Sequence, residues 1–226
     1  MHFFKPFPRI VGGFIGSDSG AMQEQGWVPE DLFLLKQVHG DSIKVLRSDS
    51  DPKKYQQAEG DGILSTVPKQ PIAIKTADCV PILFAHPSGL IGAIHAGWKG
   101  ASQEILLKSL KVAERDFSIH AAEIKLAIGP AICMGHYEVG AEVAEKFPQA
   151  RYPKTLKSFG QKFLLDLQKV NRIQALAAGV SEKNIEVVSL CTFEHPQWHS
   201  YRRSIKEGKT GAGRNYSWIF SVDLLG

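Results

Sequence analysis

The stretch that decides the fold is "TADCVPILFAHPSGLIGAIHAGWKG", residues 76–100. It contains two short apolar runs, residues 80–85 and 90–95, which proline and glycine separate. Short apolar runs with such punctuation predict buried β-strands. Cys79 precedes the first predicted strand and His95 ends the second, so two side chains that bind metals well lie at strand ends.

Similar runs continue on both sides of this stretch. They predict strands at residues 32–38, 42–47, 63–66, 71–75, 124–128, 185–190, 200–203 and 216–222. His39-Gly40-Asp41 is interpreted as a hairpin turn between the first two of these strands. Apolar residues at helical spacing predict helices at 102–117, with Ser102 as N-cap, at 139–147 and at 163–178.

Consecutive strands rather than strict alternation with helices favour an α+β fold, with a mixed β-sheet flanked by helices. No internal linker is visible, so we expect a single domain over residues 1–226. Residues 1–31 show no clear periodicity and are interpreted as an irregular N-terminal arm.

The composition excludes several classes of protein. With 27 basic and 23 acidic residues the net charge is +4, which suits an anionic small molecule but not a nucleic-acid partner. No run approaches the ~18 apolar residues that a membrane span needs, and the first residues lack a signal-peptide pattern. Three widely spaced cysteines do not form a disulfide framework. We therefore expect a cytoplasmic protein without a membrane partner, and a monomer.

Three short segments place metal-binding side chains at predicted strand ends: "KQVHG" with His39, "TADCVP" with Cys79 and "IHAGWKG" with His95. If these strands are neighbours, two imidazoles and one thiolate suit zinc with one open position, as in catalytic zinc sites. The same ligands can hold copper, but no methionine is placed by sequence as its axial ligand. Taken alone, a histidine or cysteine at a strand end is more often a structural residue than a metal ligand. Without a metal, Cys79 could instead be a nucleophile with His95 as its base.

Four further residues have a functional and a structural interpretation. Asp78 either orients a ligand or water as a catalytic residue, or only caps a turn. Gln37 and Thr76 either bind substrate or are exposed strand residues. Arg202 lies in the densest basic cluster, most of which is interpreted as a solvated hairpin, and is the arginine expected to face a pocket and hold an anion.

A competing metal site is formed in sequence by Cys191, His195 and His199, spaced by four residues. Pro196 disfavours helical geometry at His195, which weakens that site. Cys133 is either a buried structural thiol or part of a loop bordering the pocket.

Six segments in order resemble one family. They are "KQVHGDSI" (36–43), "EGDGILST" (59–66), "TADCVPILF" (76–84), "IGAIHAGWKG" (91–100), "IGPAICMGHYEVG" (128–140) and "SYRRS…TGAGRNYSWIF" (200–220). The family is that of polyphenol oxidase or laccase-like domain proteins, also described as purine nucleoside phosphorylase and as peptidoglycan editing factor. Its common "HAGWRG" reads "HAGWKG" here, so Lys99 stands where an arginine is usual.

The resemblance implies a single α+β domain similar to the cysteine-hydrolase-like toxin fold, with one zinc ion on His39, Cys79 and His95. It implies phosphorolysis of purine nucleosides (adenosine, inosine, guanosine and methylthioadenosine) and deamination of adenosine, with Lys99 or Arg202 positioning the phosphate. Two alternatives stay open: a hydrolase that removes a wrong amino acid from a nucleotide-linked muropeptide, and a non-catalytic zinc-binding module. Multicopper oxidases bind their copper cluster through paired His-x-His motifs. This sequence contains no such pair, which argues against a multicopper oxidase.

Overall fold

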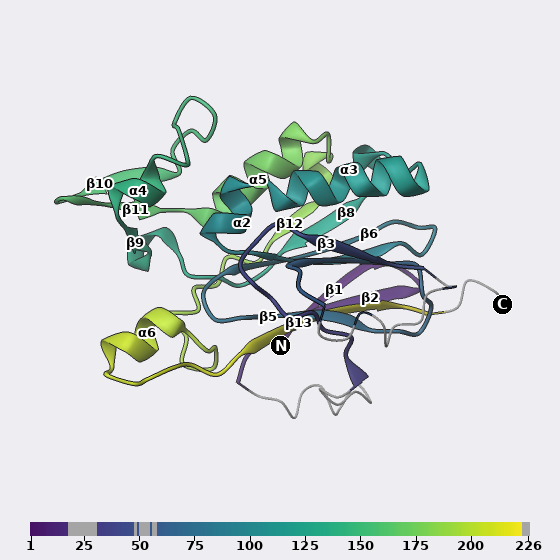
Figure 1. The fold of residues 1–226 in the computed structure, drawn as a ribbon, viewed down its shortest axis with the longest axis horizontal. Helices are drawn as coiled ribbons and strands as arrows, with labels where there is room; N and C mark the ends of the chain where they lie inside the picture. Colours follow the sequence, from purple (N-terminus) through teal and green to yellow (C-terminus); the bar gives the residue numbers. More distant parts are fainter. Residues whose placement is uncertain (18–30, 48, 50–54, 56–57, 223–226) are drawn as a thin grey trace.

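The computed structural model describes residues 1–17, 31–47, 49, 55 and 58–222. In this part of the chain, two sheets stack on one another and helices cover the outer face of the larger sheet (Figure 1). The fold is α+β, as the sequence predicts.

The larger sheet holds six of the described strands. In spatial order they are β12 (Ile185–Val187), β8 (Lys125–Ile128), β6 (Val80–Ala85), β7 (Ile91–Ala96), β4 (Gly62–Ser65) and β3 (Ile43–Leu46). The two outermost pairs are parallel and the inner pairs are antiparallel, so the sheet is mixed. The deciding stretch forms its centre as the β6–β7 hairpin.

The second sheet is antiparallel and holds four of the described strands. Their spatial order is β1 (His2–Phe7), β2 (Ile10–Ile15), β13 (Asn215–Ser221) and β5 (Ile72–Thr76). It joins segments from both ends of the sequence, because β13 pairs with β2 on one side and β5 on the other.

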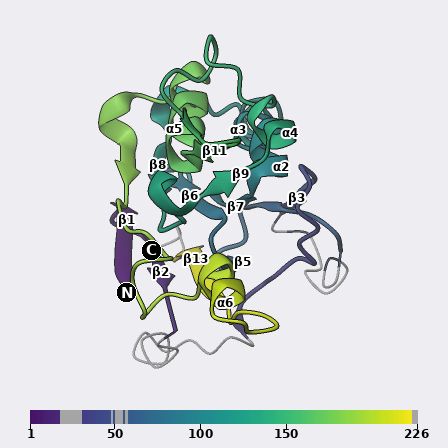
Figure 2. The same cartoon turned by 90° about the vertical axis from the view of Figure 1, so that its left-hand side faces the viewer.

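Helices α2 (Trp98–Ser102), α3 (Ile105–Phe117) and α5 (Leu167–Ala177) lie over the outer face of the larger sheet (Figure 1). Other short elements are α4 (Ala141–Ala144) and the turns η3 (Ala121–Glu123), η4 (Met134–His136) and η5 (Glu182–Asn184). A small antiparallel sheet of β10 (Leu156–Phe159), β11 (Lys162–Leu165) and β9 (Glu138–Val139) lies beyond one end of the stacked sheets. At the same end, α6 (Tyr201–Lys206) lies across from β9 (Figure 2).

The apolar run of β6 is continuous because both faces of the larger sheet are covered. Ile82 and Phe84 pack into the core under the helices, whereas Leu83 and Ala85 pack into the core between the sheets. Successive strand residues point to opposite faces, so a strand buried on both sides loses the polar alternation of a half-exposed one.

Two predicted strands are wrong. Residues 32–38 form only isolated bridges, Phe33 to Ile72 and Lys36 to Glu59, so no hairpin turn exists at 39–41. Residues 200–203 begin helix α6, because the Ser200 hydroxyl accepts a hydrogen bond from the Arg203 N–H at 3.1 Å and caps the helix.

Helix boundaries also differ from the prediction. The 163–178 helix begins at Leu167, because Asp166 caps it and Lys162–Leu165 pairs as β11 instead. In the 102–117 segment, helix α3 begins at Ile105 with Glu104 as its N-cap residue. Ser102 is instead the last residue of α2. Of the predicted 139–147 helix, Ala141–Ala144 is α-helical.

The expected irregular arm is wrong for the part that the structure describes. Residues 2–15 form the β1–β2 hairpin, and positions 18–30 lie outside the described residues. Glycines hide this strand in the sequence: a Cβ at Gly12 would lie 2.8 Å from the Trp218 carbonyl oxygen of neighbouring β13.

Among the described helices, none combines the length and the apolar character needed to traverse a lipid bilayer.

Candidate metal centre

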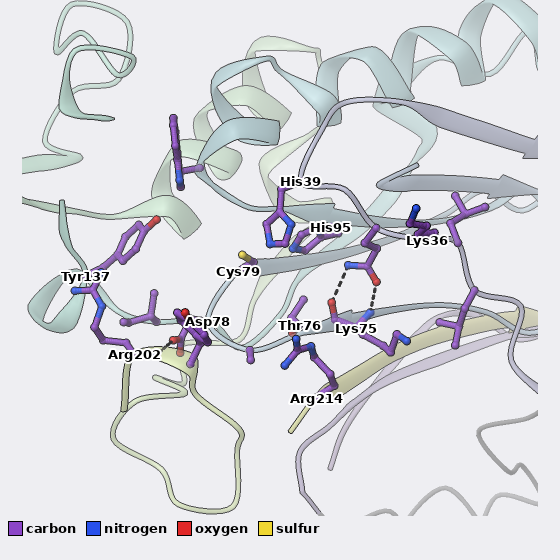
Figure 3. Close-up of a pocket in the computed structure, with 17 residues that line it drawn as sticks. Lys36, His39, Lys75, Thr76, Asp78, Cys79, His95, Tyr137, Arg202 and Arg214 are labelled. Carbon is purple, nitrogen blue, oxygen red and sulfur yellow. Dashed lines mark hydrogen bonds between the residues drawn. The ribbon is translucent and has the colours of Figure 1, made fainter. Parts of the chain in front are cut away.

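His39, Cys79 and His95 gather at one point, although they come from three separate segments (Figure 3). One potential ligand atom from each lies within 4.8 Å of the other two. The two imidazole rings meet edge to face with centroids 4.8 Å apart. Pairing of β6 with β7 brings Cys79 and His95 together, because Val80 is opposite Ala96 in the register.

Asp61 lies behind this group and was not singled out in the sequence. Its Oδ1 is 2.7 Å from Nδ1 of His95, and the two side chains are 0% and 2% exposed. A carboxylate on one ring nitrogen fixes the orientation of the imidazole and leaves the other nitrogen for a metal. The signal that could have revealed it is an acidic residue between two glycines, Gly60 and Gly62, at the start of a buried strand.

The same carboxylate shapes the loop that carries His39. Asp61 accepts hydrogen bonds from the backbone N–H groups of Val38 (3.2 Å), His39 (3.0 Å) and Gly40 (2.8 Å). His39 has a φ of +58°, a left-handed conformation that is uncommon for a residue with a side chain. Asp61 therefore positions both histidines, one through its ring and the other through its backbone.

The charges of this group are strongly coupled. Burial raises the pKa of the Cys79 thiol, but positive charge on His95 and hydrogen bonds from His39 and His95 outweigh it and bring the pKa to about 6. Burial lowers the pKa of His95, but Cys79 and Asp61 outweigh that effect and raise it to about 9. In the metal-free protein the sulfur is thus poised to lose its proton, which a metal requires of a cysteine ligand.

Glycine at position 97 makes room for the sulfur. A Cβ there would lie 3.1 Å from Sγ of Cys79 and 3.6 Å from Cδ2 of His39. Similarly, a Cβ at Gly100 would lie 2.9 Å from the Gly40 carbonyl oxygen. The glycines of "HAGWKG" therefore allow α2 to approach the His39 loop closely.

The group faces a cavity of about 820 Å³. Aromatic side chains of Trp98, Tyr137 and Tyr201 line it, together with the cations Arg202 and Arg214. Figure 3 labels Tyr137 and the two arginines around the opening beside Cys79. A volume of this size is typical of small-molecule sites. Thr76, Gln37 and Asp78 also contribute to the lining.

Asp78 has both carboxylate oxygens engaged by the protein. Oδ1 accepts from the Thr192 hydroxyl at 2.7 Å and Oδ2 from the Arg202 backbone N–H at 2.7 Å. Its φ of +94° is strained for an aspartate, and these bonds hold it in place. Asp78 therefore ties the Cys79 strand to α6 and to the loop after β12.

Gln37 is likewise held by the backbone. Its amide donates to the Lys75 carbonyl and accepts from the Lys75 N–H, both at 2.8 Å (Figure 3). Its proposed contact with substrate stays a prediction, as does that of Thr76.

The two predicted anion-binding cations differ in position. Arg202 lines the cavity, with its guanidinium 5.6 Å from the Tyr137 ring centroid and one nitrogen donating to the Glu138 carbonyl at 3.0 Å. Lys99 is exposed on α2, with Nζ 5.6 Å from the Trp98 ring centroid, and is not among the described residues that line the cavity. Arg214, from the same basic cluster as Arg202, also lines the cavity, as do Lys36 and Lys75.

The competing site of Cys191, His195 and His199 does not assemble among the described residues. Cys191 instead lies with Cys133 and Glu194. His195 is exposed, and the backbone of His199 pairs with the Asn215 side chain.

The ligand atoms of His39, Cys79 and His95 suit zinc. Two imidazoles and one thiolate, a carboxylate behind one imidazole and an adjoining cavity match a three-ligand site with an open position. Copper bound by the same three ligand types usually has a long axial methionine. None of the described residues that line the cavity is a methionine.

Comparison with known proteins gives a family match over most of the chain. Residues 18–221 match the model of the family described as "Multi-copper polyphenol oxidoreductase laccase". The chain is 32% identical over 204 residues to a purine nucleoside phosphorylase of Bacteroides thetaiotaomicron, covering 85% of this chain and 76% of the relative. It is 36% identical over 191 residues to a purine nucleoside phosphorylase of Deinococcus radiodurans, covering 82% and 69%.

A solved structure agrees with the fold. The crystal structure of YlmD from Geobacillus stearothermophilus superposes with a TM-score of 0.83 and 25% identity, covering 99% of this chain and 97% of that one. The whole described architecture is therefore similar to that of a known protein.

Proposed function

Because the chain belongs to the family described as multi-copper polyphenol oxidoreductase laccase, and similar proteins are named purine nucleoside phosphorylases, we propose that it is a zinc-dependent purine nucleoside enzyme. The proposed substrates are adenosine, inosine, guanosine and methylthioadenosine with inorganic phosphate, and the proposal includes deamination of adenosine. The observation that carries it is the convergence of His39, Cys79 and His95 on one cavity, with Asp61 behind them.

The proposed metal ligands are His39, Cys79 and His95. A zinc ion bound there would supply Lewis acidity, polarising an oxygen of phosphate, water or substrate. Asp61 keeps the His95 ring in the orientation that leaves Nε2 available, and the thiolate of Cys79 offsets part of the positive charge.

The wall of the cavity suits the two parts of a nucleoside reaction. Trp98, Tyr137 and Tyr201 offer rings on which a purine can stack. Arg202 and Arg214 offer positive charge for phosphate. In phosphorolysis a phosphate oxygen forms a bond to the ribose anomeric carbon while the bond from that carbon to the purine nitrogen breaks, giving free base and ribose 1-phosphate.

The test is a product assay on the zinc-loaded full chain, read by mass spectrometry. Inosine, guanosine and methylthioadenosine are each incubated with and without phosphate, and adenosine is included for deamination. We expect free base and ribose 1-phosphate (or its methylthio analogue) only when phosphate is present, and inosine from adenosine in either case. Consumption of no nucleoside by the zinc-loaded protein would overturn the proposal.

The same screen contains the alternative substrate. A nucleotide-linked muropeptide carrying a wrong amino acid is incubated with the protein under identical conditions. Release of that amino acid, with all four nucleosides untouched, would replace the nucleoside proposal with an editing hydrolase.

A further inference from the structure

A second group of metal-binding side chains lies where the loop after β8 meets the loop after β12. The sulfurs of Cys133 and Cys191 and a carboxylate oxygen of Glu194 lie within 4.8 Å of one another. His136 adds an imidazole, with Nε2 2.9 Å from Oε1 of Glu194. These four residues are absent from the described lining of the cavity, so the group is separate from the first centre.

Each loop supplies two of the side chains with two residues between them. Cys133 and His136 are joined by a turn in which the His136 N–H donates to the Cys133 carbonyl at 3.1 Å. Cys191 and Glu194 are joined by a similar turn, in which the Glu194 N–H donates to the Cys191 carbonyl at 3.2 Å. Pairs of ligands separated by a short turn are typical of structural zinc sites, because the turn points both side chains at one place.

The atoms of Cys133, Cys191 and Glu194 are close enough for a tetrahedral ion, whereas the His136 ring contacts Glu194 and would turn toward the sulfurs to become the fourth ligand. Zinc holds sulfur at about 2.3 Å and oxygen at about 2.0–2.2 Å, which leaves two such ligands roughly 3.5 Å apart. Sγ of Cys133 is 3.8 Å from Oε1 of Glu194. The Cys133 N–H also donates to Sγ of Cys191 at 3.2 Å, which fixes the direction of that sulfur.

We propose that Cys133, His136, Cys191 and Glu194 bind a second metal ion, of the zinc class. Two sulfurs favour a thiophilic ion, and four protein ligands close the coordination sphere, as in structural rather than catalytic zinc sites. On binding, the two thiol protons pass to solvent and the sulfurs coordinate as thiolates.

The ion would clamp two loops that shape the cavity. Tyr137, which follows His136 directly, lines the cavity. Thr192, which follows Cys191, donates its hydroxyl to Asp78 beside Cys79. The proposal does not depend on the chemistry at the first centre, because it concerns only how these loops are held.

The first test counts metal in the purified full chain by elemental analysis. We expect two zinc ions per chain in the unaltered protein and one in Cys79→Ala. Glu194→Gln changes an exposed side chain, so the fold is kept, and we expect it to reduce two ions to one. An unaltered protein that binds a single zinc ion, lost in Cys79→Ala, would overturn the proposal.

The second test uses Co²⁺ alone as a spectroscopic probe in the double variant His39→Ala, Cys79→Ala. We expect one equivalent of Co²⁺ with the near-ultraviolet charge-transfer absorption of thiolate ligands. Adding both Cys133→Ser and Cys191→Ser should abolish that absorption, because no proposed thiolate ligand is then left. Its persistence in this quadruple variant would show that the proposed ligands are wrong.

His195→Ala is the matched control, because this exposed histidine is next to Glu194 but outside the group. We expect it to leave Co²⁺ binding unchanged. An intact mass about 2 Da below the reduced chain, with no second metal bound after reduction, would identify a Cys133–Cys191 disulfide instead and overturn the proposal.

Discussion

Two of the three cysteines, Cys79 and Cys133, differ in what surrounds the sulfur. At the first centre, Cys79 faces two imidazoles, with Asp61 behind one of them, and its pKa falls to about 6 despite burial. At the second group, burial raises the pKa of Cys133, and Cys191 and Glu194 raise it further, well above its usual range. The comparison teaches that neighbouring charges and hydrogen bonds set the pKa of each cysteine, and hence which one is a thiolate in the metal-free protein.

The comparison also separates the two roles proposed for a metal. The first centre opens on a cavity with aromatic and cationic walls, whereas the second group lies beside that wall and joins two loops. The predictions below test this separation, beginning with the largest effect.

Replacing Cys79 with alanine should reduce turnover by about 10³-fold or more. Lewis-acid stabilisation is worth several kcal/mol, and about 1.36 kcal/mol corresponds to a factor of ten in rate. The measurement is kcat/KM on the best nucleoside, together with circular dichroism to show that the fold is kept. Full turnover in metal-free Cys79→Ala would contradict the metal-dependent mechanism.

Alkylation should distinguish the two thiols in the metal-free protein. At pH 7 we expect iodoacetamide to modify Cys79 on the order of 10²-fold faster than Cys133, because Cys79 is mostly thiolate and Cys133 is not. The rate at Cys79 should rise with pH through about 6 and level off above it, since the thiolate forms as pH passes the pKa. Peptide mapping measures both sites in one sample. Added zinc should protect Cys79, and equal rates at the two thiols would refute the comparison.

Asp61→Asn should weaken zinc binding at the first centre by roughly 10–100-fold, because residues that orient metal ligands typically contribute that much. Competition with a chelator measures the dissociation constant. Asp41→Asn is the matched control: Asp41 is two residues from His39 but pairs with Lys108 on the surface. Equal loss in both variants would show that Asp61 has no specific role.

Asp78→Asn should lower stability and keep the metal. One of its two hydrogen bonds, to Thr192 or to the Arg202 backbone, would be lost, at a cost of about 1–3 kcal/mol. For a chain of this size each kcal/mol lowers Tm by roughly 2–4 °C. Scanning calorimetry and zinc content measure the two effects. Loss of turnover with an unchanged Tm would instead favour the catalytic role first considered for Asp78.

Part of the candidate site was predictable because Cys79 and His95 lie at the ends of strands with simple patterns. The runs around Cys79 and His95 are apolar and short, and their strands are adjacent in the sheet. His39 was grouped with them from its own segment, which is not the strand that was expected, and the family resemblance made the three residues the expected ligand set.

Asp61 was missed for a physical reason. Its role depends on three backbone N–H groups and one imidazole that are more than 20 residues away in sequence. Likewise, the pairing of Cys133 with Glu194 spans 61 residues, and spacing reasoning selected His195 and His199 instead.

The β1–β2 hairpin could not be predicted from the sequence, because the residues of β2 are chosen by their packing against the distant strand β13. Gly12 is required by the Trp218 backbone on β13, and such a contact leaves no local periodicity. Similarly, the Ser200 cap competes with the strand propensity of the residues that follow it, and only the packed structure decides between them.

The position of β13 has a consequence for biosynthesis. Residues 10–15 can pair early with β1, but they find their second partner only when residues 215–221 have left the ribosome, because β13 lies between β2 and β5. Until then the four-stranded sheet that packs on the larger sheet is incomplete, and Arg214 is not yet at the cavity. Nascent chains stalled before residue 215 should therefore expose apolar surface and remain unable to complete the binding site.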